Sequence, residues 1–307
     1  MSSLNTNVAA LTALQTLNKS SKELLVTQNR ISTGLRVASA ADNAAYFSIA
    51  TTLRSDNAAI STVADALGLG SATVEVAEAG IKNAIETVSQ IKAKLVAARA
   101  PGLDRAKIQT EISALQSSLR STADSAVFSG QNFLAGDSTG PTTKTIVSSF
   151  SRDSTGAISI GTISIDVGPT GTLLFDTGGA GAGILDSDRT VTSGATYSVA
   201  TLDISAITDD SADLVDLEDL VKGVDAALSA ITDAATILGA AKSRISLQSD
   251  FVSKLRDTID TGIGQLVDAD LNEESTRLQA LQVRQQLGVQ ALGIANQSAQ
   301  QILSLFQ

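Results

Sequence analysis

Two stretches of the chain carry branched aliphatic residues at an unbroken seven-residue spacing, and this repeat restricts the fold more than any other feature. One stretch precedes residue 100 and the other follows residue 210. An apolar heptad held this long specifies long helices wound in a left-handed supercoil. At 1.5 Å per residue each helix is about 60–80 Å long, which predicts a rod rather than a compact globule. The predicted seam of the rod consists of Leu53, Ile60, Leu67, Val74, Ile81, Val88, Leu95, Leu217, Val224, Ile231, Leu238, Ile245, Val252, Ile259 and Leu266.

Helix-breaking and capping residues set the ends of these helices. All three prolines lie between residues 100 and 170, outside both heptad stretches. Ser39 and Asp42 have the spacing of a capping box and predict the start of the first long helix. Pro101 and Gly102 predict a tight turn at its end. A shorter helix is expected to fold back along the first, with Ile108, Ile112, Leu115 and Leu119 on one face.

The middle of the chain differs from both flanks. Residues 140–205 are rich in Gly, Ser and Thr. Apolar residues alternate with other residues at Ile158 and Ile160, and again at Ile163 and Ile165, which is typical of short strands. We expect a small β-rich domain here. The alternative is a flexible low-complexity loop.

The two ends of the chain, residues 1–36 and 271–307, are each predicted to form one amphipathic helix. Burial of one Leu or Ile is worth about 1.5–3 kcal/mol, and an isolated helix is marginal in water, so their apolar stripes need a partner. The ends can pair with each other, and such pairs can pack against other copies, which predicts polymerisation through the termini. After Arg284 the chain is rich in Gln and has no charged residue, as expected where the polar face is also buried. The predicted subunit-interface residues are Leu4, Val8, Leu11, Leu14, Leu25, Ile31, Leu35, Leu278, Leu281, Leu292, Ala295, Ala299, Ile302 and Phe306.

The amphipathic helices at the two ends of the chain have two alternative interpretations. One is an ordinary coiled-coil dimer, and the other is a helix lying on a membrane surface, which the scarcity of basic residues disfavours. No continuous apolar stretch of about 20 residues predicts a membrane-spanning helix. The N-terminus lacks the basic and apolar regions of a removable Sec-type signal, so export would need another route.

The composition excludes several kinds of chemistry. The chain has no Cys, His or Trp, so it has no thiolate nucleophile, no histidine base and no Cys/His zinc site. A net charge of -10 disfavours nucleic acid as a partner. The acidic residues in 209–219 lack the alternation and the Gly of a calcium loop. Composition does not exclude a hydrolase with paired carboxylates, but no pair stands out. We therefore expect no enzyme, no cofactor and no metal.

Both flanks of the chain contain short distinctive motifs. They are SLNTN at residues 3–7, ISTGLRVASAADNAA at 31–45, SGQNFL at 129–134, EESTRLQ at 273–279, ANQ at 295–297 and LSLF at 303–306. These motifs resemble those of bacterial flagellins, and the resemblance covers residues 1–140 and 205–307. Many flagellins have a small segment that contains Gly where this chain has Tyr46 and Phe47, and in this respect the chain resembles flagellins of the alphaproteobacterial type.

The resemblance implies a mainly α fold, in which the two flanks form a long antiparallel helical coiled-coil rod with a small β-rich central outer domain. It implies a structural subunit of the bacterial flagellar filament, exported through the flagellar type III system and self-assembling through its terminal helices into a helical tube for swimming motility. The implied segments are residues 1–40 and 269–307 as inner-core polymerisation helices, 41–139 and 206–268 as the two parts of the rod, and 140–205 as the outer domain.

The same resemblance implies partners and a location. The partners are other flagellin subunits, the flagellar cap, the hook–filament junction proteins and an export chaperone, and the location is the secreted, extracellular filament. The alternatives are a hook–filament junction protein or another axial structural protein of a secretion system. Gln90, Lys94 and Glu111 align with the Arg, Leu and Glu that the animal innate immune receptor detects in some flagellins. Only the Glu is kept, which implies weak recognition.

Overall fold

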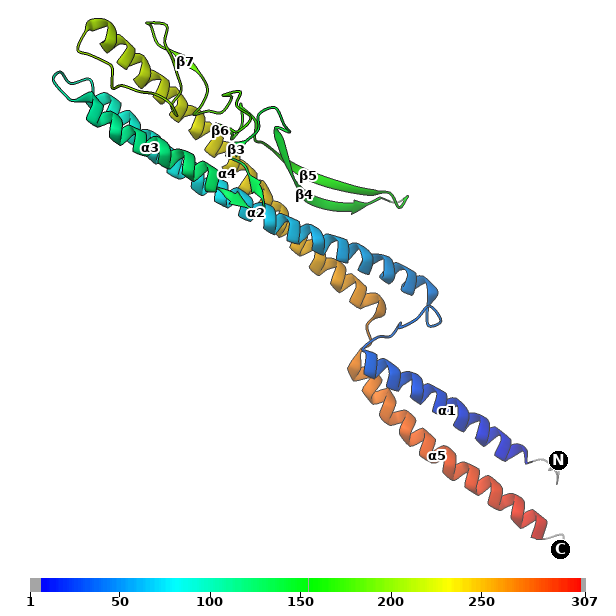
Figure 1. Cartoon of the computed structure of the whole chain (residues 1–307). Helices are drawn as coiled ribbons and strands as arrows, with labels where there is room; N and C mark the ends of the chain where they lie inside the picture. The colour runs from blue at the N-terminus through cyan, green and yellow to red at the C-terminus, as the bar shows by residue number, and fades with distance from the viewer. Residues whose placement is uncertain (1–6, 154, 305–307) are drawn as a thin grey trace. The chain divides into compact units, whose positions relative to one another are not determined.

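The computed structural model describes residues 7–153 and 155–304, with side chains described as far as residue 297 (Figure 1). The chain divides into two compact units, residues 1–57 with 257–307, and residues 58–256. The described helices are α1 (Val8–Thr33), α2 (Ala44–Ala97), α3 (Arg105–Ser125), α4 (Ser211–Val267) and α5 (Leu271–Ser304). The described strands are β1 (Val127–Phe128), β2 (Gln131–Asn132), β3 (Ala135–Gly136), β4 (Thr143–Arg152), β5 (Ile158–Asp166), β6 (Phe175–Asp176), β7 (Arg189–Thr190) and β8 (Thr196–Tyr197).

Residues 58–256 are built on the antiparallel pair of α2 and α4. Lys92 forms an ion pair with Asp225, and Lys242 forms one with Glu78 at 3.2 Å, so residue numbers fall along α4 as they rise along α2. The heptad residues of this unit are at most 4% exposed, which places them in its core. They are Ile60, Leu67, Val74, Ile81, Val88, Leu95, Leu217, Val224, Ile231, Leu238, Ile245 and Val252. The predicted mainly α fold with helical flanks is confirmed.

Helix α3 follows a turn at Pro101 and Gly102, as the sequence predicts. Gly102 has a φ of 78°, which an L side chain adopts only with strain. The carboxylate of Asp104 then caps α3 by accepting a hydrogen bond from the backbone N–H of Lys107 at 3.3 Å. Ile112 and Leu119 are buried, and Glu111 of α3 pairs with Lys94 of α2 at 2.5 Å. The chain has therefore folded back along α2.

The start of α2 differs from the prediction. Ser39 donates its N–H and its hydroxyl to the carboxylate of Asp42, at 2.9 and 3.0 Å, and these two residues close a turn before the helix. The helix begins at Ala44, because Asn43 Oδ1 accepts the N–H groups of Ala45 and Tyr46, both at 3.1 Å. The cap of α2 is thus Asn43.

The central region contains four two-stranded sheets among the described residues. β1 pairs with β2, β4 with β5 and β7 with β8, all antiparallel, and β3 pairs with β6 in parallel. Most of these strands are two residues long, so loops make up much of the region. One loop is ordered by Asp176, whose carboxylate accepts the N–H and hydroxyl of Ser138 at 3.0 and 2.8 Å. The backbone N–H of Ser138, more than any other donor, holds the pKa of Asp176 well below its usual range. The predicted strands in a small central region are confirmed.

Two helical glycines let this region pack on α2 and α4. A Cβ at Gly70 of α2 would lie 2.5 Å from Cγ2 of Ile146, which belongs to β4. A Cβ at Gly223 of α4 would lie 1.9 Å from the hydroxyl oxygen of Tyr197. That hydroxyl donates to the carbonyl oxygen of Asp219 at 3.0 Å. Larger residues at these positions would push the strands off the helices.

Helix α4 also has the length and the composition of a membrane span. One 18-residue window within it reaches a mean hydropathy of 1.3, and a third of that window, 33%, is buried. The heptad side chains of α4 within residues 58–256 pack against the same unit, which accounts for this apolar composition.

Candidate assembly surface on the terminal helices

Helices α1 and α5 form an antiparallel pair. Asn7 caps α1, its Oδ1 accepting the N–H of Ala10 at 3.0 Å, and α1 ends at Gly34 with a φ of 72°. Asp270 caps α5 by accepting the N–H of Asn272 at 2.8 Å. The amide of Asn7 also donates to the carbonyl oxygen of Ala295 at 2.9 Å, near the far end of α5. Both helices therefore begin with a side-chain cap and run in opposite directions.

Three of the four fully buried residues between the two helices, in the α1–α5 seam, are polar, and Leu17, Leu24 and Leu278 are half-buried. Ser20 and Thr27 of α1 are buried, as are Glu274 and Leu281 of α5. Gly288 brings α5 close to Leu17, because a Cβ there would lie 3.2 Å from Leu17 Cδ1. Small side chains thus let the helices approach.

The large apolar residues of the α1–α5 pair mostly face away from the seam. Ten of them are between 46% and 67% exposed: Val8, Leu11, Leu14, Leu25, Val26, Leu271, Val283, Leu287, Val289 and Ile294. Polar residues at most of the fully buried positions, with large apolar residues left in water, differ from the usual arrangement of a water-soluble helix pair. This pair carries an exposed apolar surface of the kind that marks an interaction site.

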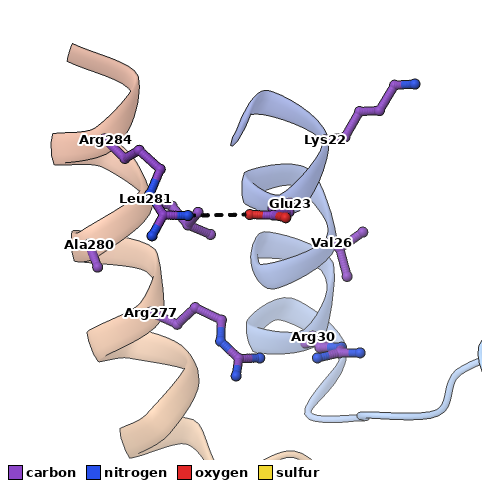
Figure 2. Close-up of a pocket in the computed structure, with 8 residues that line it drawn as sticks. All are labelled: Lys22, Glu23, Val26, Arg30, Arg277, Ala280, Leu281 and Arg284. Atoms are coloured by element: carbon purple, nitrogen blue, oxygen red, sulfur yellow. Dashed lines mark ion pairs between the residues drawn. The ribbon is translucent and has the colours of Figure 1, made fainter. Parts of the chain in front are cut away.

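A basic groove of about 510 Å³ lies between the two helices (Figure 2). Four of its lining side chains are cationic, and Arg284 of α5 lies 3.7 Å from Glu23 of α1. The lining residues are Lys22, Glu23, Val26, Arg30, Arg277, Ala280, Leu281 and Arg284.

The buried Glu274 binds two of the cationic side chains that line this groove. Its Oε1 accepts hydrogen bonds from Arg30 at 2.9 Å and from Arg277 at 3.3 Å. Its Oε2 is buried and has no hydrogen-bond partner among the described residues. Glu274 therefore links the two helices by charge, because Arg30 belongs to α1 and Arg277 to α5.

The predicted interface residues fall into three groups. Val8, Leu11, Leu14 and Leu25 lie on the outward surface, exposed to solvent. Leu281 is buried in the α1–α5 seam, and Ile31, Leu35, Leu278, Leu292 and Ala295 are half-buried within their unit. Leu4 and Phe306, together with the side chains of Ala299 and Ile302, lie outside the described residues. Their assignment to a subunit interface stays a prediction.

The outward apolar residues of α5 were not among the predicted ones. Val283, Leu287 and Ile294 share one face of α5, because their spacings of four and seven residues return to the same side of a helix. That face is opposite the one that carries Leu278 and Leu281. A second stripe at helical spacing was the signal that could have identified them.

The remaining predicted residues lie elsewhere in the fold. Leu53, Ile259 and Leu266 pack against a small core of buried residues within residues 1–57 and 257–307. That core consists of Val37, Ala50, Ile263 and Val267. Gln90 is exposed on α2, while Lys94 and Glu111 are paired with each other. Among the residues that the structure describes, no three acidic, His or Cys side chains are grouped so that they could hold a metal ion.

Comparison with known proteins identifies the family. The bacterial flagellin N-terminal helical region matches residues 4–139, and the bacterial flagellin C-terminal helical region matches residues 221–306. The chain is 43% identical to flagellin A and 46% identical to flagellin C of Rhizobium meliloti (strain 1021), and 44% identical to flagellin of Brucella melitensis biotype 1. Each comparison covers 100% of both chains. The chain therefore belongs to the bacterial flagellins and is a structural subunit of the extracellular flagellar filament, a polymer of such subunits.

Proposed function

We propose that subunits assemble by burying the outward apolar stripes of α1 and α5 against the same helices of other copies. The inverted arrangement of this pair carries the proposal, since ten large apolar side chains are exposed while Ser20, Thr27 and Glu274 are buried. Burying these side chains in a polymer supplies the apolar stabilisation that the single chain lacks.

The other segments take the roles that follow from this assembly. Residues 1–40 and 269–307 form the inner core of the filament, 41–139 and 206–268 form the rod around it, and 140–205 form the outer domain. The subunit reaches the filament through the flagellar type III system. The cap, the hook–filament junction proteins and an export chaperone are its transient partners. It has no enzymatic role, and the absence of His and Cys supports this.

Recognition by the animal innate immune receptor for flagellin is weak. The proposal rests on Gln90 and Lys94, which replace the Arg and Leu of recognised flagellins, and on the 2.5 Å ion pair that engages Lys94 with Glu111. A receptor reporter assay with purified protein is expected to give a response far below that of a recognised flagellin. A response of equal strength would overturn this proposal.

The assembly proposal is tested at Leu25, which is exposed on α1. Leu25→Asp is expected to leave the thermal unfolding of the monomer unchanged and to abolish filaments in electron micrographs, because assembly would bury an unpaired charge. Leu25→Met keeps the apolar character of the position and is the matched control, expected to form normal filaments. Normal filaments from Leu25→Asp would refute a role for this surface in assembly.

A further inference from the structure

The β4–β5 hairpin carries an apolar cluster on the side that faces away from its own unit. In β5 the alternation of apolar residues changes phase, from Ile158 and Ile160 to Ile163 and Ile165. Because successive side chains of a strand point to opposite faces, this change places the two pairs on opposite faces of the hairpin. One strand therefore supplies apolar residues to both faces.

The residues at the base of the hairpin show which of its faces is the inner one. Ile163 and Ile165 are buried, and Ile146, which lies opposite Ile163, packs onto Gly70 of α2. Residues on this same face nearer the tip are small or polar. They are the opposed pairs Ser149 with Gly161, and Ser151 with Ser159.

The outer face has the reverse distribution near the tip. Ile158 and Ile160 are 56% and 62% exposed. The half-buried Phe150 lies directly opposite Ile160 on the same face, and Arg152 lies opposite Ile158. The register shift between Val147 and Ser149 moves Phe150 onto this face, since four residues along a regular strand would have kept it on the face of Ile146. An antiparallel sheet with one covered face normally turns polar residues to water, so this outer cluster is the opposite of what a monomer needs.

From this inversion we propose that the outer face of the β4–β5 tip, formed by Phe150, Ile158 and Ile160, docks on a second copy of this chain in the filament. The small size of this cluster indicates that its partner is a neighbouring copy in the polymer. A stable interface between free proteins takes about 20–30 residues from each side, and three side chains are far too few. Such a contact holds only where another interaction already keeps the partner next to it, as a polymer does for neighbouring copies. A two-stranded hairpin is itself marginal in water, and docking also stabilises its tip.

The first test compares two double variants that alter opposite faces at the same level of the hairpin. In Ile158→Thr with Ile160→Thr, the β-branched shape is kept and the apolar surface is reduced. In the control, Ser151→Thr with Ser159→Thr, the polar inner face is altered instead. We expect both purified monomers to unfold at the wild-type temperature. Filaments of the first variant should leave about tenfold more soluble subunit at equilibrium, and those of the control should match wild type.

Three outcomes would overturn the proposal. One is an unchanged soluble concentration for the first variant. Another is a lowered unfolding temperature of its monomer, which would mean that the chain itself covers these residues. The third is micromolar self-association of the wild-type monomer that the first variant removes, which would mean that the face binds without the polymer. Since α1 and α5 are unaltered in these variants, each of these outcomes leaves the assembly proposal untouched.

A second measurement uses the absence of cysteine from the chain. Ile160→Cys and Ser159→Cys each give one thiol, on the outer and inner faces of the tip. We expect alkylation of the thiol in Ile160→Cys to be at least tenfold slower in filaments than in monomers, and that in Ser159→Cys to change little. Equal rates in monomer and filament for Ile160→Cys would contradict docking of the outer face.

Discussion

The α1–α5 pair and the α2–α4 pair are both antiparallel helix pairs, yet they distribute their side chains in opposite ways. Between α2 and α4, Leu, Ile and Val occupy the buried positions, and ion pairs such as Lys92 with Asp225 lie nearer the surface. Between α1 and α5, the buried positions include Ser20, Thr27 and Glu274, while large apolar residues lie outside.

The difference separates two ways of stabilising a helix pair. The α2–α4 pair removes its apolar surface from water within one chain, so folding alone stabilises it. The α1–α5 pair leaves that surface in water until other copies cover it. One chain thus combines a region that is complete by itself with a region that is complete only in the polymer.

The largest effect is expected at the centre of the α2–α4 pair. Leu238→Asp places a charge at a fully buried position without a partner and is expected to cost on the order of 4–5 kcal/mol or more, so that residues 58–256 no longer fold cooperatively. Ala240→Asp, at an exposed position two residues further on, is expected to unfold as wild type does. Circular dichroism melting of both variants measures the difference. Similar melting of the two would remove the contrast between the helix pairs.

An intermediate effect is expected from one substitution at two places on α5. Leu281 is buried in the α1–α5 seam and Leu287 is exposed. Leu281→Ala should destabilise the pair by about 2–3 kcal/mol in the monomer, and Leu287→Ala by less than about 0.5 kcal/mol. Hydrogen exchange of α1 amides in the monomer reports this loss.

In filament assembly, Leu287→Ala is expected to have the larger effect of the two. Leu287→Ala should raise the soluble subunit concentration about tenfold, because its side chain is covered only in the polymer. If Leu287→Ala weakens the monomer as much as Leu281→Ala does, the outward stripe packs within the chain and the proposed assembly surface is wrong.

The sequence predicted the α2–α4 pair well because a heptad repeat carries its own register. Each heptad position from Leu67 to Leu95 is apolar and buried. The turn at Pro101 and Gly102 was equally predictable, since proline fixes φ and glycine adopts the positive φ that the turn requires. The start of α2 could not be predicted in this way, because Ser39, Asp42 and Asn43 are all residues that can cap a helix. Only the three-dimensional structure shows which of them caps α2.

The α1–α5 pair shows why the candidate surface was harder to read. α5 has two apolar stripes, and local spacing does not say which of them faces α1. Small residues decide, because Ser20, Thr27 and Gly288 allow close approach on one side only. In the central region, the parallel pairing of β3 with β6 joins segments about 40 residues apart in sequence, beyond what alternation within a strand can predict.

The smallest effect concerns the ion pairs of the two regions. Glu274→Gln removes a buried charge that two guanidinium groups share, and is expected to destabilise the α1–α5 pair by about 1–3 kcal/mol. Arg99→Gln removes the exposed ion pair between Arg99, which follows α2, and Glu218 of α4. This substitution is expected to lower the free energy of unfolding by less than about 0.5 kcal/mol. Hydrogen exchange of α1 and α2 amides in the two monomers compares these losses. Equal losses would mean that solvent screens both ion pairs alike, so that Glu274 would not link α1 to α5. A loss confined to Glu274→Gln would mean that the buried polar residues of the α1–α5 seam help to hold the terminal helices together before assembly.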